Sequence, residues 1–132
     1  MQIDFTGRVA LVTGAGAGMG ASVAELLASC GAAVAALDRE ADRVEDTGAR
    51  IEARGGRVLR LTADITDTAQ MQHAFEQIEA TFGRLDFVHA HAGINGVWAP
   101  IDEITPEEWD RTMRVNLRGA YLTVHHAAPL LK

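Results

Sequence analysis

The chain has 132 residues, of which 48% are apolar and 23% charged, a composition typical of one soluble globular domain rather than of a disordered or fibrous chain. Its formal net charge of −6 argues against nucleic acid and acidic membrane surfaces as partners, because both need clustered cations. The single cysteine, Cys30, forms no internal disulfide, and the first residues contain no basic segment or long apolar core, so we expect a reducing, cytoplasmic setting.

Short apolar runs and helical patterns alternate through the first half of the chain. Residues 9–12 predict a buried strand, and the apolar spacing of residues 19–30 predicts a helix that ends at Gly31. Residues 34–37 predict a second strand, which is followed by a charged helix over residues 39–54. Strands that are apolar on both faces are typical of a parallel sheet covered on both sides.

The second half continues this alternation. Residues 58–61 predict a third strand, a helix follows from a cap at Asp67, and residues 85–91 predict a fourth strand. Thr105, Pro106 and Glu108 predict the start of a last long helix. Strands that alternate with helices at this spacing indicate β-α-β units, and hence one doubly wound α/β domain over residues 1–132.

A glycine-rich stretch, residues 13–20, joins the first strand to the first helix. Such a turn offers unpaired backbone N–H groups and the positive end of a helix dipole, which together bind an anionic phosphate. Two dinucleotide fingerprints fit the stretch, one (G-x-G-x-x-G/A) beginning at Gly16 and the other (T-G-x-x-x-G-x-G) at Thr13. Both predict a nucleotide, in contact with Gly14, Gly16, Gly18, Met19 and Gly20.

Asp38 stands at the end of the second predicted strand, eighteen residues after Gly20. A carboxylate at this point accepts hydrogen bonds from the adenosine ribose and repels a 2′-phosphate, so NAD is favoured over NADP. Arg39 argues in the opposite direction, because a guanidinium could pair with a 2′-phosphate. We favour its other interpretation, a solvated residue at the start of a helix.

Five segments in order resemble the N-terminal part of the short-chain dehydrogenase/reductase family, and the resemblance covers essentially the whole chain. Residues 13–20 are similar to the family's cofactor motif, Asp38 to its NAD-selecting acid, and Asp64-Ile65 to its pair in contact with the adenine. Ala90-His91-Ala92-Gly93 resembles the family's Asn-Asn-Ala-Gly segment, and Val115-Asn116-Leu117 resembles the helix segment that holds an active-site Asn.

The resemblance implies a Rossmann-like, doubly wound parallel sheet with strand order 3-2-1-4 and a cofactor across the carboxyl ends of strands one and two. It implies an oxidoreductase that transfers a hydride between NAD(H) and an alcohol or carbonyl substrate. Asp64, Ile65, Ala92 and Gly93 would then belong to the cofactor site. Asn116 would kink its helix and hold a water of the proton relay; its other interpretation is a polar residue in a helix that bonds locally.

Two departures from the family pattern matter. His91 stands where the family usually has an Asn that ties neighbouring strands together. The family also uses a Tyr with a Lys four residues later, whose charge lowers the pKa of the Tyr. This sequence has one Tyr, Tyr121, and one Lys, Lys132, with His125 four residues after Tyr121. We therefore expect an NAD(P)-binding domain that is truncated before the catalytic Tyr/Lys segment and is inactive by itself.

The apolar stripe of the last helix also carries an expectation. Tyr121 falls on this apolar face, where its simplest role is packing. Without further chain to cover them, the fourth strand would be an exposed edge and the stripe would lie bare, so we expect a homo-oligomer. The stripe consists of Leu117, Tyr121, Val124 and Leu131.

Three other functions were weighed against the dehydrogenase. A metal site is not expected, because His125 and His126 diverge by about 100° on a helix and no Cys or carboxylate cluster completes a ligand set with His89 and His91. A non-catalytic nucleotide-binding or interaction module, half of a split protein, remains an alternative. An S-adenosylmethionine-dependent methyltransferase is disfavoured, because Thr13 rather than an acid precedes the first glycine.

Overall fold

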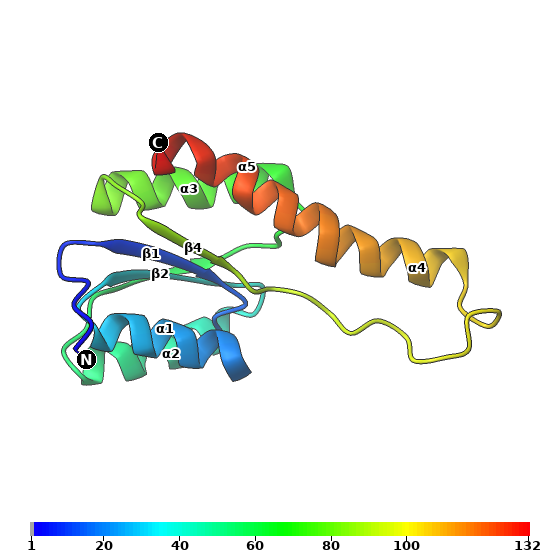
Figure 1. The fold of residues 1–132 in the computed structure, drawn as a ribbon, viewed down its shortest axis with the longest axis horizontal. Helices are drawn as coiled ribbons and strands as arrows, with labels where there is room; N and C mark the ends of the chain where they lie inside the picture. Colours follow the sequence, from blue (N-terminus) through cyan, green and yellow to red (C-terminus); the bar gives the residue numbers. More distant parts are fainter. Residues whose placement is uncertain (1) are drawn as a thin grey trace.

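Four parallel strands form the centre of the computed structural model, which describes residues 2–132 (Figure 1). They are β1 (Val9–Thr13), β2 (Ala33–Asp38), β3 (Val58–Thr62) and β4 (Phe87–Ala90). Their order in the sheet is β3-β2-β1-β4, and every neighbouring pair is parallel. The predicted order 3-2-1-4 and the doubly wound architecture are confirmed.

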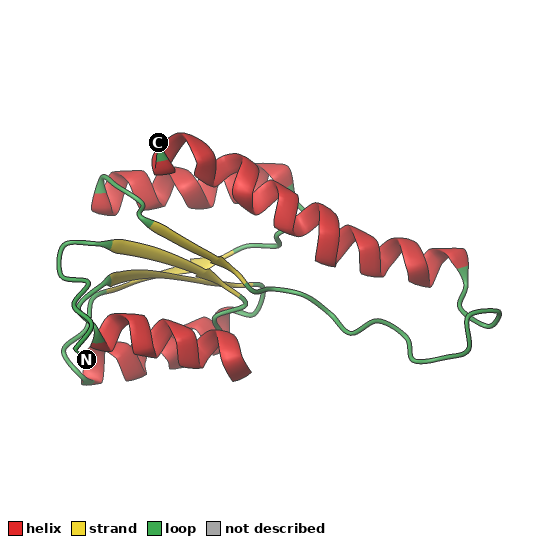
Figure 2. Ribbon diagram, in the orientation of Figure 1, coloured by secondary structure: helices red, strands yellow, loops and turns green. Residues whose placement is uncertain are grey.

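Helices cover both faces of this sheet (Figure 2). On one face lie α1 (Gly18–Ser29) and α2 (Ala41–Ala53), and on the other lie α3 (Thr68–Phe82) and α5 (Gly119–Leu131). A fifth helix, α4 (Pro106–Met113), joins α5 through a π-helical turn, η1 (Arg114–Arg118), so the last predicted helix is one long rod with a widened turn.

The predicted caps at Asp67 and Thr105 are present in the structure. Asp67 caps α3 by accepting a hydrogen bond from the Gln70 amide at 3.0 Å, and Gly83 ends the helix at a φ of 72°. Thr105 and Glu108 form the predicted capping box at the start of α4, with both hydrogen bonds present. These ends depend on residues within one turn of each other, which makes them visible in sequence.

The strands bury alternate side chains on opposite faces of the sheet, as expected for a sheet covered on both sides. Leu11 and Leu37 point into the layer under α3 and α5. Val12 and Val34 point into the layer under α1 and α2. All four side chains are completely buried. The sheet therefore serves as the common floor of two apolar cores.

The inward face of α1 differs from the one that apolar spacing predicts. Met19 and Leu26 are 73% and 62% exposed, whereas Gly20, Ala21 and Ala24 are buried. The reason is close packing: a Cβ at Gly20 would collide with the backbone carbonyl of Gly14. Small residues let the helix approach the strand end, so the larger apolar residues are turned outward.

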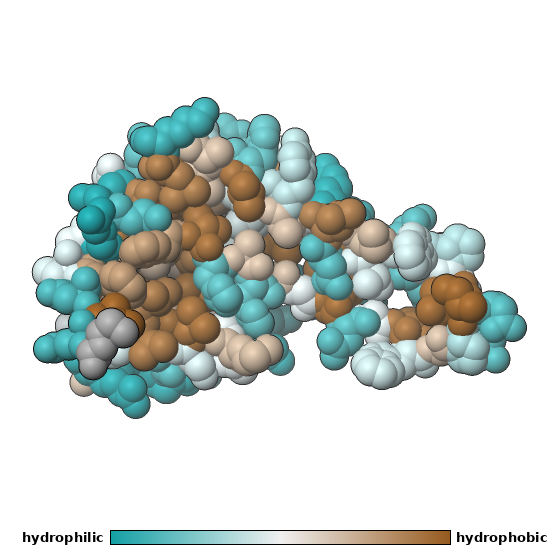
Figure 3. Space-filling view, in the orientation of Figure 1, coloured by the Kyte–Doolittle hydropathy of each residue, from teal (hydrophilic) through white to brown (hydrophobic). Residues whose placement is uncertain are grey.

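The fourth strand is shorter than predicted and forms one edge of the sheet. It ends at Ala90, and its only strand neighbour among the described residues is β1. Figure 3 shows apolar surface between the two helical layers, where this edge lies. The following arm, residues 91–105, extends away from the sheet (Figure 1), and Trp98 within it is 86% exposed. Within residues 2–132, every helix falls short of the length and apolar character that a membrane span requires.

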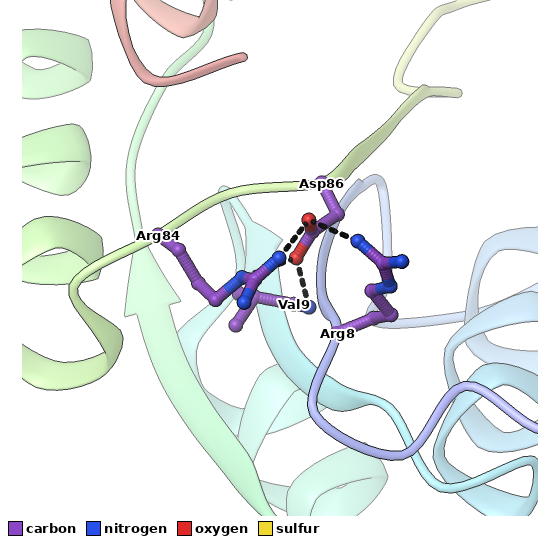
Figure 4. A network of polar contacts seen from close by, with 4 residues as sticks. All are labelled: Arg8, Val9, Arg84 and Asp86. Carbon is purple, nitrogen blue, oxygen red and sulfur yellow. Dashed lines mark hydrogen bonds and ion pairs between the residues drawn. The ribbon is translucent and has the colours of Figure 1, made fainter. Parts of the chain in front are cut away.

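The amino ends of β1 and β4 are joined by the carboxylate of Asp86 (Figure 4). It accepts hydrogen bonds from the Val9 amide at 2.9 Å, from Arg84 at 2.7 and 2.9 Å, and from Arg8 at 3.3 Å. The hydrogen bonds from Arg84, with those from Val9 and Arg8, lower the pKa of Asp86 to about 2. A charged group therefore fixes the edge strand to the centre of the sheet.

We expect Asp86→Asn to lower the free energy of unfolding by about 1–3 kcal/mol, because the amide loses charge-assisted hydrogen bonds. Chemical denaturation of both proteins measures the difference. A carboxylate with a lowered pKa stabilises fully above its unfolded value near 3.9 and loses this effect as the pH falls through about 2. The unfolding free energies of the two proteins should therefore approach each other as the pH falls toward 2.

Asp46→Asn is the matched control, since Asp46 is an exposed carboxylate on α2. Equal unfolding free energies for Asp86→Asn and Asp46→Asn at neutral pH would contradict the role given to Asp86.

Candidate cofactor site

A cleft of about 390 Å³ lies at the carboxyl ends of the strands. Its walls come from the turn after β1, the end of β2, the segments after β3 and β4, and η1. The sequence-predicted residues among its lining are Gly14, Asp38, Arg39, Asp64, Ile65, Ala92 and Gly93. Segments far apart in the sequence therefore meet at the edge where a parallel α/β sheet binds ligands.

The remaining predicted residues adjoin this cleft. Gly16, Gly18, Met19 and Gly20 belong to the turn or to the first turn of α1. Asn116 lies in η1 beside Val115, which does line the cleft. Ala17 and Val115, which lie inside predicted segments, also line the cleft. Spacing and motif did not single out five further lining residues, which are Leu37, Glu40, Arg43, Ala63 and Ile94. They carry no motif of their own and are brought to the cleft by the fold.

The glycine turn is fixed to the end of β2. The Gly16 amide donates a hydrogen bond to Asp38 Oδ2 at 2.9 Å, and a Cβ at Gly16 would lie 2.7 Å from Arg43 Cβ. Gly14 and Gly18 have φ values of 66° and 55°, in the left-handed region that favours glycine. The backbone and Asp38 can approach each other this closely only because Gly16 has no side chain.

The first turn of α1 has no side-chain cap and no acidic residue. By contrast, the starts of α3 and α4 are capped by Asp67 and Thr105. The first amides of a helix have no partner within the helix, and they carry the positive end of its dipole. The N-terminal end of α1, which lies beside the cleft, is thus suited to bind an anionic group such as a phosphate.

Asp38 is held in place by two backbone amides. Its Oδ2 accepts from Gly16, and its Oδ1 accepts from Glu40 at 3.0 Å. These contacts fix the carboxylate at the end of β2 with unused lone pairs, since each oxygen can accept more than one hydrogen bond. A preoriented acceptor at this position can bind a hydroxyl donor.

Asp64 and Ile65 form the opposite wall. Asp64 Oδ1 accepts from the amide and hydroxyl of Thr66 at 2.9 and 2.7 Å. The backbone hydrogen bond from Thr66 is the largest cause that lowers the pKa of Asp64, and Arg39 and Arg114 add to the effect. Ile65 is buried, and a Cβ on Gly119 would lie 2.5 Å from its Cδ1. This wall therefore places the carboxylate of Asp64, whose pKa is lowered, next to the apolar side chain of Ile65.

Asn116 binds the backbone of the arm through both of its amide atoms. Its Oδ1 accepts from the Ile94 amide and its Nδ2 donates to the Ile94 carbonyl, each at 2.7 Å. The interpretation of Asn116 as a locally bonded residue is therefore wrong. A Cβ at Gly93 would lie 2.9 Å from Asn116 Oδ1, so glycine there makes room for this pairing. Its place in a π-helical turn matches the expectation of an irregular helix at this residue.

We expect Asn116→Ala to release the start of the arm, because both hydrogen bonds to Ile94 disappear. Hydrogen exchange at the Ile94 amide should become about tenfold faster, which corresponds to about 1.4 kcal/mol of lost local stability. Asn95→Ala is the control, since it removes the same group from the neighbouring residue of the loop. If both variants left the exchange rate at Ile94 unchanged, Asn116 would not hold the arm.

Two ring pairs involve His89, His91, His125 and Tyr121. The rings of His89 and His91 stack in parallel, 5.4 Å apart and inclined by 9°. The ring centroids of Tyr121 and His125 are 5.5 Å apart, and Tyr121 is 59% exposed, so it does not pack into the core of the described residues. Among residues 2–132, no group of three His, Cys, Asp or Glu side chains is placed to hold a metal ion.

Comparison with known proteins identifies the family. The family model described as short chain dehydrogenase matches residues 8–132. This chain belongs to the short-chain dehydrogenases. It is 36% identical to the D-threitol dehydrogenase of Mycolicibacterium smegmatis over 126 residues, which are 92% of this chain and 48% of that protein.

Solved structures of short-chain dehydrogenases and reductases agree with the fold. A 3-ketoacyl-ACP reductase from Sinorhizobium meliloti 1021 is 49% identical, with a TM-score of 0.91 over 94% of this chain and 49% of its own. NAD+-bound xylitol dehydrogenase is 28% identical, with a TM-score of 0.94 over 96% of this chain and 49% of its own. A metagenomic short-chain oxidoreductase in complex with NADP is 30% identical, with a TM-score of 0.90 over 99% and 58%. The chain spans about half the length of the relatives it matches.

Proposed function

We propose that this chain is the NAD(H)-binding half of an oxidoreductase that transfers a hydride between the cofactor and an alcohol or carbonyl substrate. The observation that supports this most strongly is the fixed carboxylate of Asp38, which stands in the cleft beside a glycine turn and an uncapped helix start. A dinucleotide carries anionic phosphates next to ribose hydroxyls. The uncapped helix start can bind the phosphates, and the carboxylate can accept hydrogen bonds from the hydroxyls.

Each wall of the cleft suits one part of a dinucleotide. The free amides at the start of α1 would receive the diphosphate, and Asp38 would accept hydrogen bonds from the adenosine ribose. Ile65 offers an apolar surface to the adenine, and Asp64 stands beside it as a hydrogen-bond acceptor. Ala92 and Gly93 have small side chains or none, so the cofactor could lie close to their backbone. The bound nicotinamide supplies the hydride chemistry, and the protein orients it.

NAD is proposed over NADP because Asp38 would face a 2′-phosphate with its negative charge. Arg39 and Arg43 also line the cleft and could attract such a phosphate, but the Asp38 carboxylate is fixed in position by two amides. Repulsion from a fixed charge is not relieved by a rotamer change. We therefore infer that Asp38 decides the preference.

This proposal predicts that the chain binds NADH at least about tenfold more tightly than NADPH, as measured by the fluorescence of the reduced nicotinamide. Asp38→Ser should weaken NADH binding about tenfold, because a ribose acceptor is lost, and should reduce or reverse the preference. Asp42→Asn is the control, since Asp42 is an exposed carboxylate on the first turn of α2. Equal affinities for both cofactors in the unaltered chain would refute the assignment of Asp38.

The proposal assigns cofactor binding to these 132 residues and turnover to a longer protein. The sequence holds one Tyr and one Lys, and His125 takes the place of a Lys four residues after Tyr121. A general acid at neutral pH needs such a neighbouring cation to lower the pKa of a Tyr. We therefore infer that the chain binds its cofactor without turnover, with Asn116 positioned for the catalytic half.

We also propose that the chain associates with a second copy of itself through the outer face of η1 and α5. Leu117, Tyr121 and Val124 follow at helical spacing, and each is more than half exposed. Their alignment on one face makes a continuous apolar strip, which in water favours a protein contact. A second copy carries the same strip, so the two can cover each other symmetrically.

Light scattering at high protein concentration should give a mass larger than that of one chain. Val124→Asp should shift the protein toward the monomer, because the contact would bury an unpaired charge. Gln72→Asp is the control, since it adds the same charge at an exposed position on α3. A mass of one chain at every concentration would overturn self-association through this face.

A further inference from the structure

Arg118, at the end of η1, reaches the loop that follows β3. Its Nη1 donates a hydrogen bond to the Thr66 carbonyl at 2.9 Å, although the two residues are 52 positions apart. The next residue, Gly119, packs against the same loop, because a Cβ there would lie 2.5 Å from Ile65 Cδ1. Two consecutive residues of the rod therefore hold the loop that forms one wall of the cleft.

Asp64 is oriented by contacts within this loop. Its Oδ1 accepts from the Thr66 amide and hydroxyl, and its own amide donates to Gln70 Oε1 at 2.9 Å. None of the hydrogen bonds described for residues 2–132 ends on Asp64 Oδ2, although the residue lines the cleft. This oxygen is therefore the one that can accept a hydrogen bond from a ligand.

The loop needs fixed points outside itself, since its internal hydrogen bonds set its shape but not its place. One fixed point is its start, where the Ala63 amide donates to the Asp38 carbonyl at 3.1 Å. A second is the Thr66 carbonyl, which Arg118 binds. A guanidinium forms a stronger hydrogen bond to a carbonyl than a neutral donor does. Thr66 thus binds Asp64 through its amide and hydroxyl, and Arg118 through its carbonyl.

We infer that Arg118 is a positioning residue of the cofactor site, which holds Asp64 and Ile65 in place for the adenine by binding Thr66. The inference rests on the proposed function, since it needs a dinucleotide whose adenine lies against this wall. Arg118 is absent from the described residues that line the cleft, so its effect reaches the ligand through Thr66. An acceptor that is fixed before the ligand binds reduces the cost of ordering the complex.

The consequence is a preference for the amino group of adenine. This group can donate a hydrogen bond to Asp64 Oδ2, whereas hypoxanthine carries a carbonyl oxygen at the same position of its ring. A carbonyl oxygen cannot donate and is repelled by a carboxylate. The ratio of the affinities for the two bases therefore reports the position of Asp64. A general loss of stability would weaken the binding of both dinucleotides equally and leave this ratio unchanged.

Fluorescence titration with NADH and with reduced nicotinamide hypoxanthine dinucleotide tests this inference. We expect the unaltered chain to bind NADH at least about tenfold more tightly, because a hydrogen bond to a charged acceptor distinguishes the two. Arg118→Met should weaken NADH binding about three- to tenfold and reduce the preference to about threefold or less. Arg118→Lys retains a charged donor and should show an intermediate preference. Arg118 is exposed, so neither change disturbs the apolar cores.

Arg114→Met is the matched control, since it removes the same charge from the same turn, η1. Arg114 acts on Asp64 through its charge, which adds to the lowering of the pKa of that carboxyl by the Thr66 backbone hydrogen bond. No described hydrogen bond joins its side chain to Thr66, so the preference for NADH should be retained. An equal loss of preference in Arg114→Met and Arg118→Met would assign the effect to charge and overturn the inference.

The remaining outcomes separate the two proposals. An unchanged preference in Arg118→Met, or equal weakening of both dinucleotides, overturns the role of Arg118 and leaves the proposed function standing. Equal affinities of the unaltered chain for NADH and its hypoxanthine analogue do the same, because Asp64 would then not contact the amino group. Absence of NADH binding by the unaltered chain overturns the proposed function and this inference with it.

Discussion

The close approach of the start of α1 to the end of β1 is the constraint on which this structure depends. Gly20 sits against the Gly14 carbonyl with no space for a side chain, and Gly14 and Gly18 adopt left-handed backbone. This packing aims the first amides of α1 at the carboxyl edge of the sheet. It also turns Met19 outward, which apolar spacing alone would have placed inside. The placement of α1 and the candidate anion site at its start thus have one cause.

Two carboxylates complete the cleft, and each is held by hydrogen bonds rather than by packing. Asp38 accepts from the amides of Gly16 and Glu40, and Asp64 accepts from Thr66. Backbone amides hold such side chains within narrow limits, because the amides themselves are fixed by strand ends. The site is therefore largely preorganised by the same segments that end β2 and β3. Preorganisation of this kind reduces the cost of ordering a ligand.

The part of the fold beyond β4 is organised by one side chain. Asn116 binds both backbone atoms of Ile94 from a π-helical turn, which joins the arm to the rod formed by α4 and α5. The rod carries the apolar strip on its outer face and Val115 on the side of the cleft. The candidate cofactor site and the proposed contact with a second copy are thus both in contact with the segment that contains η1.

Local signals made much of this structure predictable. The caps of α3 and α4 and the glycine turn follow from residues close in sequence, and the strand order follows from the family resemblance. The candidate site residues Gly14 and Asp38 were predicted from the glycine turn and a following strand end, and Asp64 and Gly93 from the family resemblance; all four lie at one edge of the sheet. Arg43 and Ile94 were not predicted, since Arg43 lies in an ordinary charged helix and Ile94 follows the last residue of a predicted segment without belonging to it.

By itself, the sequence determined the class of the fold and the ends of its elements, because hydrophobic periodicity and capping act over a few residues. Only the tertiary structure decided the pairing of Asn116 with Ile94 and the joining of β1 to β4 by Asp86, which span 22 and 77 positions. It also decided which face of α1 is buried. These features depend on backbone approach in three dimensions, for which a linear pattern of residue types carries no signal.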